Sequence, residues 1–291
     1  MPTVQANGIE LYYEDVGQGE PMLLVMGLGA QMVFWDPLFI RGLVERGFRV
    51  ISYDNRDVGL SSHLHHLPVP RLRPMLARAA VRLPVAAPYL LDDMAADAVA
   101  LLDALDIDSA HVLGVSMGGM IAQILATAHA PRVRTMTSIM SHPGDALSRF
   151  AKPRALRALF KPMARDRAGA IERYLDIRRA LSGPRFAFDE AYWRERANLA
   201  FDRAVYPRGF LRHVAAITAA KSRVPALRAS SMPALVVHGT KDPLVLPRGG
   251  RATARALQNA RLLMIDGMGH ELPPPVYDLL IDGVAALAAA I

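Results

Sequence analysis

The sequence predicts an α/β fold in which a mostly parallel central sheet, flanked by helices, carries an inserted helical cap. Two observations predict it. Short apolar runs alternate with helical patterns in the first half of the chain, and this alternation stops after residue 141 and resumes after residue 230. Continuous apolar runs are typical of strands buried on both faces, as in parallel sheets. Residues 1–141 and 231–291 are therefore expected to form one core domain, and residues 142–230 a cap.

Local patterns predict the order of the elements. Residues 3–6 and 10–15 flank Asn7-Gly8, a strong hairpin turn pair. Further strands are expected at 21–26, 48–54, 111–116, 133–140, 233–239 and 261–266, and core helices at 36–46, 92–105, 118–129 and 273–290. The cap has no convincing buried strand, and Arg-rich helical patterns cover 152–165, 168–181, 189–202 and 207–221.

The composition indicates a folded protein with a sizeable core. The chain has 291 residues, of which 52% are hydrophobic and 21% charged, a balance that disfavours long disordered regions. The absence of cysteine excludes disulfides, zinc–thiolate sites and a cysteine nucleophile, and it fits a reducing compartment. The chain does not start with a basic segment followed by an apolar run, and no stretch reaches the roughly 18 apolar residues of a membrane span. We therefore expect a cytoplasmic protein with no stable membrane span.

The basic residues are unevenly distributed. The net charge of +7 combines +11 over residues 142–232, +4 over residues 63–90 and −8 over the remainder. An acidic core with two basic insertions and no RNA-binding or zinc-finger signature favours a solvated surface, so no nucleic-acid partner is expected. Residues 71–83 are basic and apolar, but Pro74 and Pro84 limit any membrane-surface helix there, and a lid over a pocket is favoured.

A nucleophile motif lies between a predicted strand and a predicted helix. Residues 114–118 read Gly-Val-Ser-Met-Gly, which fits G-x-S-x-G in the context that this motif requires. A serine on a tight strand-to-helix turn projects its Oγ from the sheet, and glycines two residues before and after it avoid clashes in the strained turn. These observations predict that Ser116 is a catalytic nucleophile.

A serine hydroxyl needs a base, and in this topology an acid and then a histidine follow the serine along the chain. His270 lies in a glycine-containing loop after the last strand, which can carry an imidazole over the sheet edge where Ser116 is expected. Asp242 follows a buried strand 28 residues earlier and is the predicted acid, with Asp145 as the alternative. No catalytic role is assigned to the other histidines after the serine: His129, His142, His213 and His238.

Acyl transfer also needs backbone N–H groups that stabilise an oxyanion. The amide of Met117, directly after the serine, is one expected donor. The second is Leu28 N–H, in the glycine-containing turn at 26–30, although these glycines would equally suit a plain turn. No metal or organic cofactor is needed for this chemistry. The histidines within 63–66 lack the nearby carboxylates or thiolates that would favour a metal site.

These residues resemble the α/β-hydrolase superfamily, and the resemblance runs over nearly the whole chain. Residues 54–61 look like the family's D-x-R-x-x-G-x-S segment, in which Asp54 and Arg56 brace the loops around the oxyanion turn. The likeness is closest to the esterase/lipase branch that includes aclacinomycin-type methylesterases, where the oxyanion strand also ends in Val-Met-Gly, here residues 25–27. Serine in place of aspartate at the nucleophile position argues against haloalkane dehalogenase and epoxide hydrolase chemistry.

The resemblance and the residues together imply a serine carboxylester hydrolase that acts through an acyl-enzyme intermediate on a small-molecule or lipid-like ester. A cofactor-free perhydrolase or haloperoxidase and a carbon–carbon bond hydrolase would use the same residues and stay open as alternatives. A non-catalytic, ligand-binding receptor on the same fold is a further alternative, although an intact Ser/Asp/His set argues against it. The cap is expected to shape the substrate pocket.

Overall fold

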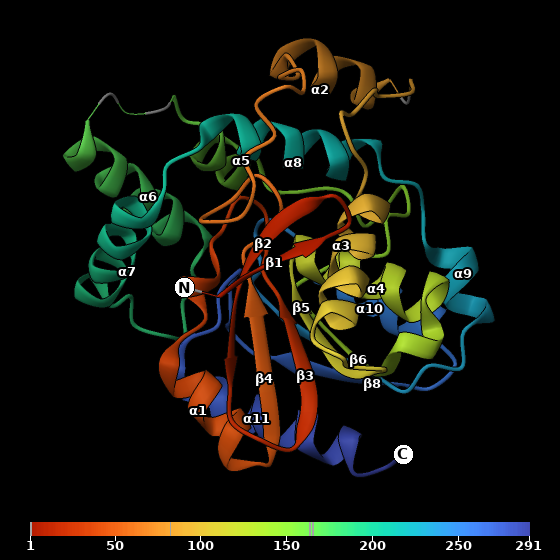
Figure 1. Ribbon diagram of the computed structural model, residues 1–291. Helices are drawn as coiled ribbons and strands as arrows, with labels where there is room; N and C mark the ends of the chain where they lie inside the picture. Colours follow the sequence, from red (N-terminus) through yellow and green to blue (C-terminus); the bar gives the residue numbers. More distant parts are fainter. Residues whose placement is uncertain (1, 82, 163, 165) are drawn as a thin grey trace.

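In the described residues, eight strands form one sheet at the centre of the molecule (Figure 1). The computed structural model describes residues 2–81, 83–162, 164 and 166–291, and Arg82 of the predicted basic segment lies outside them. The strand order across the sheet is β1-β2-β4-β3-β5-β6-β7-β8. The bounds are β1 (Thr3–Ala6), β2 (Ile9–Val16), β3 (Glu20–Val25), β4 (Phe48–Tyr53), β5 (Ala110–Val115), β6 (Val133–Ile139), β7 (Ala234–Gly239) and β8 (Ala260–Ile265).

The sheet is antiparallel at one edge and parallel elsewhere. β1 and β2 form the predicted hairpin, whose turn is made by Asn7 and Gly8 at φ 49° and 76°. β2 pairs antiparallel with β4, and every later pair from β4 to β8 is parallel. All six residues of β5 and of β7 are buried, which explains why these strands are apolar apart from one histidine in each. The predicted fold class is confirmed, and each predicted strand is present within one residue at either end.

Helices cover both faces of the sheet. α1 (Pro37–Glu45) and α11 (Tyr277–Ala288) pack together on one face, and α3 (Leu91–Ala104), α4 (Met117–Ala128) and α10 (Arg248–Ala256) lie on the other. Asp36 caps α1 by accepting a hydrogen bond from Leu38 N–H, and Pro37 takes the first helical position, where its missing N–H costs nothing. Each face therefore has its own apolar layer.

The segment between β6 and β7 contains the Arg-rich helices. They are α5 (Pro153–Leu159), α6 (Arg167–Leu181), α7 (Glu190–Arg203), α8 (Pro207–Ala219) and α9 (Val224–Ala229). α5 and α8 lie beyond the sheet end toward which β4 points, with α6 and α7 beside them (Figure 1). α9, the last helix of this segment, instead packs against α4 and α10 on one face of the sheet.

The basic segment between β4 and α3 folds over α8. It forms α2 (Leu72–Ala80), which has Pro74 in its first turn, where no intrahelical hydrogen bond is lost. Met75 is buried against Val214 and Ala215 of α8, and Leu76 lines the cavity described below. Among the described residues, no helix combines the length and apolar character that a membrane crossing requires.

Candidate active site

Ser116 lies on a strained turn between β5 and α4. Its backbone has φ 55° and ψ −115°, a conformation that non-glycine residues rarely adopt. A side chain at Gly114 would lie 2.1 Å from the carbonyl of Gly118, and one at Gly118 would lie 2.0 Å from the carbonyl of Val25. Glycine is therefore required at both flanking positions, as the motif predicts.

The loop after β8 brings His270 to the serine. His270 Nε2 lies 3.0 Å from Ser116 Oγ, and His270 Nδ1 lies 2.7 Å from Asp242 Oδ2. With Nδ1 protonated toward the carboxylate, Nε2 is free to accept the serine proton. The backbone N–H of His270 donates to the carbonyl of Leu181 at 2.8 Å, which ties this loop to the end of α6. The three side chains therefore form one hydrogen-bonded chain.

Asp242 is held in its ionised form. Oδ1 accepts hydrogen bonds from the N–H groups of Leu244 and Val245 at 2.8 and 2.9 Å, which leaves Oδ2 for His270. Burial alone would raise the pKa of Asp242, but the charge of His270 and hydrogen bonds with His238 and His270 lower this pKa to about 2. The carboxylate can therefore orient the imidazole and stabilise its charged form.

The alternative acid and His142 lie in a different arrangement. The carboxylate of Asp145 accepts a hydrogen bond from Ser148 N–H at 3.0 Å, within its own turn. His142 Nδ1 accepts from Gly144 N–H, and burial together with the nearby charge of Arg223 lowers the pKa of His142 to about 3. The Asp145 carboxylate and the His142 ring thus each bind a backbone N–H within three residues in the chain.

The turn after β3 lies against the serine. A side chain at Gly27 would lie 3.2 Å from the Cβ of Ser116 and 3.3 Å from the carbonyl of Val115. Leu28 follows Gly27. Met117 is the first residue of α4, and an N–H group in the first turn of a helix has no intrahelical acceptor. Within the described residues, neither amide donates a hydrogen bond. Two backbone donors are thus available beside Ser116 Oγ.

A cavity of about 560 Å³ opens above these residues. Its wall is largely apolar, with several aromatic side chains, and comes from the turn after β3, from α5, α6, α7 and α8, and from the His270 loop. Phe34 and Tyr174 stack with ring centroids 5.1 Å apart, and Tyr174 lies 6.4 Å from Trp193. The wall includes Phe34, Trp35, Ser116, Tyr174, Trp193 and His270. The serine is therefore reached through an apolar pocket large enough for a small organic molecule.

Comparison with known proteins agrees with this architecture. The profile of the α/β hydrolase fold family matches residues 20–273. The chain belongs to the α/β-hydrolase family. It is 28% identical over 314 residues to rhodomycin D methylesterase DnrP of Streptomyces peucetius, covering 98% of both chains. It is 27% identical over 288 residues to a non-heme haloperoxidase of Rhodococcus erythropolis, covering 93% of both chains.

A solved structure with the same fold is the meta-cleavage product hydrolase of Pseudomonas fluorescens. It superimposes on this α/β-hydrolase with a TM-score of 0.77 at 20% identity, covering 100% of this chain and 98% of the other. Together these matches confirm the resemblance to the superfamily and to its methylesterase branch.

In this α/β-hydrolase, Asp54 and Asn55 brace the turn after β3. Asp54 Oδ1 accepts from Met32 N–H at 2.7 Å, and Asn55 Nδ2 donates to the carbonyl of Met26 at 3.1 Å. Arg56, expected to act with Asp54, instead pairs with Asp97 of α3 through two hydrogen bonds of 2.6 and 2.5 Å. The bracing of this turn therefore comes from residues 54 and 55.

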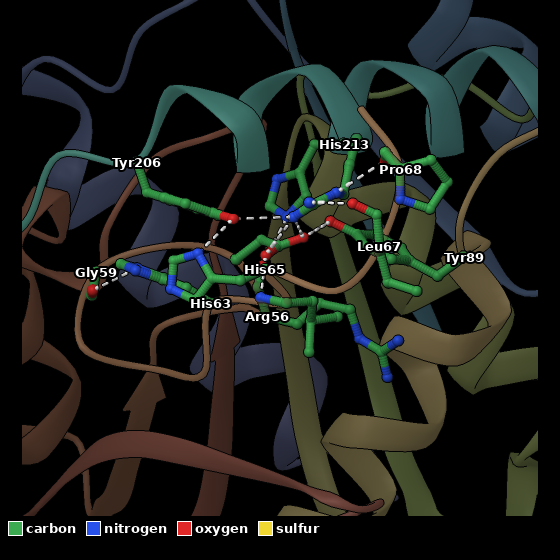
Figure 2. Close-up of polar contacts among 12 residues, drawn as sticks. Arg56, Gly59, His63, His65, Leu67, Pro68, Tyr89, Tyr206 and His213 are labelled. Atoms are coloured by element: carbon green, nitrogen blue, oxygen red, sulfur yellow. Dashed lines mark hydrogen bonds and ion pairs between the residues drawn. The ribbon is translucent and has the colours of Figure 1, made fainter. Parts of the chain in front are cut away.

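His213 of α8 is a functional candidate that sequence reasoning missed. Its ring is buried between α8 and the core (Figure 2), where Nδ1 accepts from Gly29 N–H at 3.2 Å and Nε2 donates to the carbonyl of Arg56 at 2.8 Å. Burial lowers the pKa of His213 to about 4, so the ring stays neutral and Nδ1 remains an acceptor near neutral pH. α8 thus holds the turn that carries Leu28. The sequence signal was a histidine on an otherwise apolar stretch of a predicted helix, next to Arg212.

The histidines considered as a metal cluster contact the start of α8 instead. Figure 2 shows His63 and His65 beside Tyr206. The rings of His63 and Tyr206 stack at 4.2 Å, and His65 Nδ1 lies 3.2 Å from the Tyr206 hydroxyl. His63 Nε2 also contacts the carbonyl of Gly59 at 3.1 Å. These side chains join the segment between β4 and α2 to the start of α8.

Proposed function

We propose that this α/β-hydrolase is a serine carboxylester hydrolase that forms an acyl-enzyme intermediate. The observation that carries the proposal is the hydrogen-bonded chain from Ser116 through His270 to Asp242, beside two free backbone amides at the base of the cavity. The similarity to a named methylesterase over the full chain supports the same reaction class.

In the acylation step, Ser116 Oγ attacks the ester carbonyl carbon and its proton passes to His270 Nε2. The carbonyl oxygen becomes an oxyanion that accepts hydrogen bonds from Leu28 and Met117 N–H. Asp242 stabilises the imidazolium that forms. When the carbon–oxygen bond to the leaving group breaks, His270 donates its proton to that oxygen and an alcohol departs.

Deacylation repeats this sequence with water as the nucleophile. His270 removes a proton from the water as its oxygen attacks the acyl carbonyl, and the same two amides stabilise the second oxyanion. Collapse of this intermediate returns the proton to Ser116 Oγ and releases a carboxylic acid. The chain's own residues therefore complete the cycle.

Two other reactions use the same residues. The similarity to a haloperoxidase favours a test of peracid formation, in which hydrogen peroxide replaces water in deacylation. A carbon–carbon bond hydrolase would cleave a vinylogous diketone instead of an ester. Comparing p-nitrophenyl acetate hydrolysis with peracid formation and diketone cleavage in one preparation ranks the three, and we expect the ester to give the highest kcat/KM.

A fluorophosphonate probe separates a hydrolase from a ligand-binding receptor. We expect stoichiometric labelling of the wild type, no labelling of Ser116→Ala, and hydrolysis of p-nitrophenyl esters by the wild type alone. A labelled Ser116→Ala variant would contradict the assignment of the nucleophile. A profile from acetate to palmitate esters then shows whether the pocket prefers short or lipid-like acyl chains.

The proposal includes a role for residues 142–230 as the cap that shapes the pocket, since α6 and α7 supply much of its wall. It also includes a cytoplasmic location, which the lack of cysteine favours. Cell fractionation with an antibody against this chain tests the location.

A further inference from the structure

Arg178 of α6 lines the cavity and has no carboxylate partner among the residues that the structure describes. Its guanidinium carbon lies 3.8 Å from the centre of the Trp193 ring, and both residues line the cavity wall. Its Nε atom is buried and has no hydrogen-bond acceptor among the described residues. Its two terminal nitrogens are not among the buried atoms and make no hydrogen bond within the described residues, so they are the donors open to a ligand in the cavity.

Two other arginines line the cavity, but each is tied to the backbone by two hydrogen bonds. Arg149 donates to the backbone carbonyls of Gly144 and Ala220, and Arg173 donates to those of Lys161 and Leu159. Arg149 and Arg173 therefore bind the backbone of neighbouring segments, while Arg178 retains donors that a ligand can meet.

The carboxylates that line the cavity are engaged elsewhere. Asp36 accepts from Leu38 N–H at 2.7 Å and from the Tyr277 hydroxyl at 3.1 Å. Glu271 accepts from Gly183 N–H at 2.6 Å. Within the described residues, neither forms an ion pair with Arg178, and three arginines against two carboxylates leave the cavity lining with a formal charge of +1.

Arg178 shares the cavity with the reacting groups. Ser116, His270 and Arg178 all line it, and the carbonyl of Leu181, which follows Arg178 by three residues on α6, accepts the His270 N–H at 2.8 Å. A ligand group on Arg178 can therefore belong to the same molecule as the ester at Ser116.

We propose that the cavity binds esters carrying an anionic group, and that the Arg178 guanidinium, stacked on Trp193, binds this group. The inference rests on the proposed function and names its substrate class. A carboxylate is the expected group because the planar guanidinium fork matches its two oxygens. The aromatic wall around Arg178 suits a flat carbon skeleton next to that carboxylate.

The competing explanation is that Arg178 only clamps α6 onto α7 through Trp193. Arg196 of α7 offers a matched control. Its guanidinium also lies over an aromatic ring, 5.4 Å from the centre of Tyr192, and its Nε is also buried without a partner, yet it does not line the cavity. A clamping role predicts similar effects of both substitutions, whereas anion binding predicts an effect of Arg178 alone.

The test compares esters of equal size that differ in charge. The pairs are 4-acetoxybenzoate with 4-acetoxybenzamide, and methyl 4-carboxybenzoate with methyl 4-carbamoylbenzoate. In at least one pair we expect the wild type to favour the anion by about 10- to 100-fold in kcat/KM, the size of one charge-assisted pair. Arg178→Met should remove this preference, mainly through KM, while Arg196→Met keeps it. Equal kcat/KM within both pairs, or a preference that survives in Arg178→Met, would overturn the inference.

A binding measurement separates this inference from the proposed function. Both tryptophans of the chain, Trp35 and Trp193, line the cavity, so their fluorescence reports binding without turnover. In Ser116→Ala, 4-hydroxybenzoate should bind at least tenfold more tightly than 4-hydroxybenzamide, and Arg178→Gln should abolish the difference. Anion binding without any hydrolysis in the wild type would reject the esterase proposal alone. Hydrolysis without selective anion binding would reject the role of Arg178 alone.

Discussion

Replacing His213 tests whether α8 holds in place the turn that carries Leu28, the proposed oxyanion donor. His213→Leu removes the acceptor for Gly29 N–H and the donor to the Arg56 carbonyl, while it keeps apolar volume between α8 and the core. A buried backbone group without a partner costs about 1–3 kcal/mol of unfolding free energy. Because the Arg56 carbonyl is buried whereas Gly29 is exposed, the full penalty applies only to the carbonyl, and we expect the variant to lose about 1–3 kcal/mol.

The decrease in kcat should be smaller in His213→Leu than in a variant that lacks an oxyanion donor altogether. Removing one oxyanion donor typically costs about 10²–10³ in kcat, but in His213→Leu the Leu28 N–H is only displaced. Since a misplacement of about 1 Å can cost about 10²-fold, we expect kcat for p-nitrophenyl acetate to fall about 10- to 100-fold, with a smaller change in KM.

The assay must separate catalysis from unfolding. Rates are expressed per active site titrated with a fluorophosphonate, well below the Tm of each variant. His213→Asn places an oxygen near the position of Nδ1 and should recover part of the lost kcat. Ala215→Gly, buried on the same helix, should cost about 1 kcal/mol of stability without changing kcat. An unchanged kcat in His213→Leu, or an equal loss in Ala215→Gly, would refute the reasoning.

Three further predictions concern the proposed triad and the buried histidines. Ser116→Ala should lower kcat by about 10⁴–10⁶, measured in p-nitrophenyl ester hydrolysis, and retained turnover would point to another nucleophile. Asp242→Asn should lower kcat by about 10⁴ because an amide favours the wrong imidazole tautomer. Asp145→Asn should lower kcat only slightly. The reverse pattern would assign the role of the acid to Asp145. Burial lowers the pKa of His213 to about 4 and that of His142 to about 3, whereas a histidine in the unfolded chain has a pKa of 6.5. Below pH 6.5, protons therefore bind preferentially to the unfolded chain. The free energy of unfolding, measured with denaturant, should therefore fall from pH 7 to pH 5 by up to about 1.4 kcal/mol per pH unit for each histidine. The fall should be smaller in His213→Asn, and equal stability at both pH values would contradict this.

The sheet and the neighbourhood of the serine could be predicted because their signals are local. A buried strand reads as an apolar run, and G-x-S-x-G between a strand and a helix restricts where Ser116 can lie. The chain order of acid and histidine then placed Asp242 and His270 after two neighbouring strands, and the structure brings both to Ser116. Loops at the carboxyl ends of parallel strands meet at one sheet edge, so topology alone carried this prediction.

The contacts of the cap could not be predicted in the same way. His213 and Gly29 are 184 residues apart, and their hydrogen bond depends on how α8 crosses the core. The open donor of Arg178 likewise depends on how α6 and α7 pack, because an Arg-rich helix reads from sequence as a solvated face. Periodicity indicates that a helix exists, but it does not indicate which groups its side chains contact in the folded protein.

The contact between His213 and Gly29 also limits how such a protein can be redesigned. The inserted segment leaves and rejoins the core at β6 and β7, which are adjacent strands, so another segment could be spliced in without disturbing the sheet. A chimaera built this way would keep its fold but would lack the acceptor for Gly29 N–H unless the new segment supplied one. Substrate range and reaction rate therefore cannot be varied independently by exchanging the segment, and a library of such exchanges should retain the imidazole.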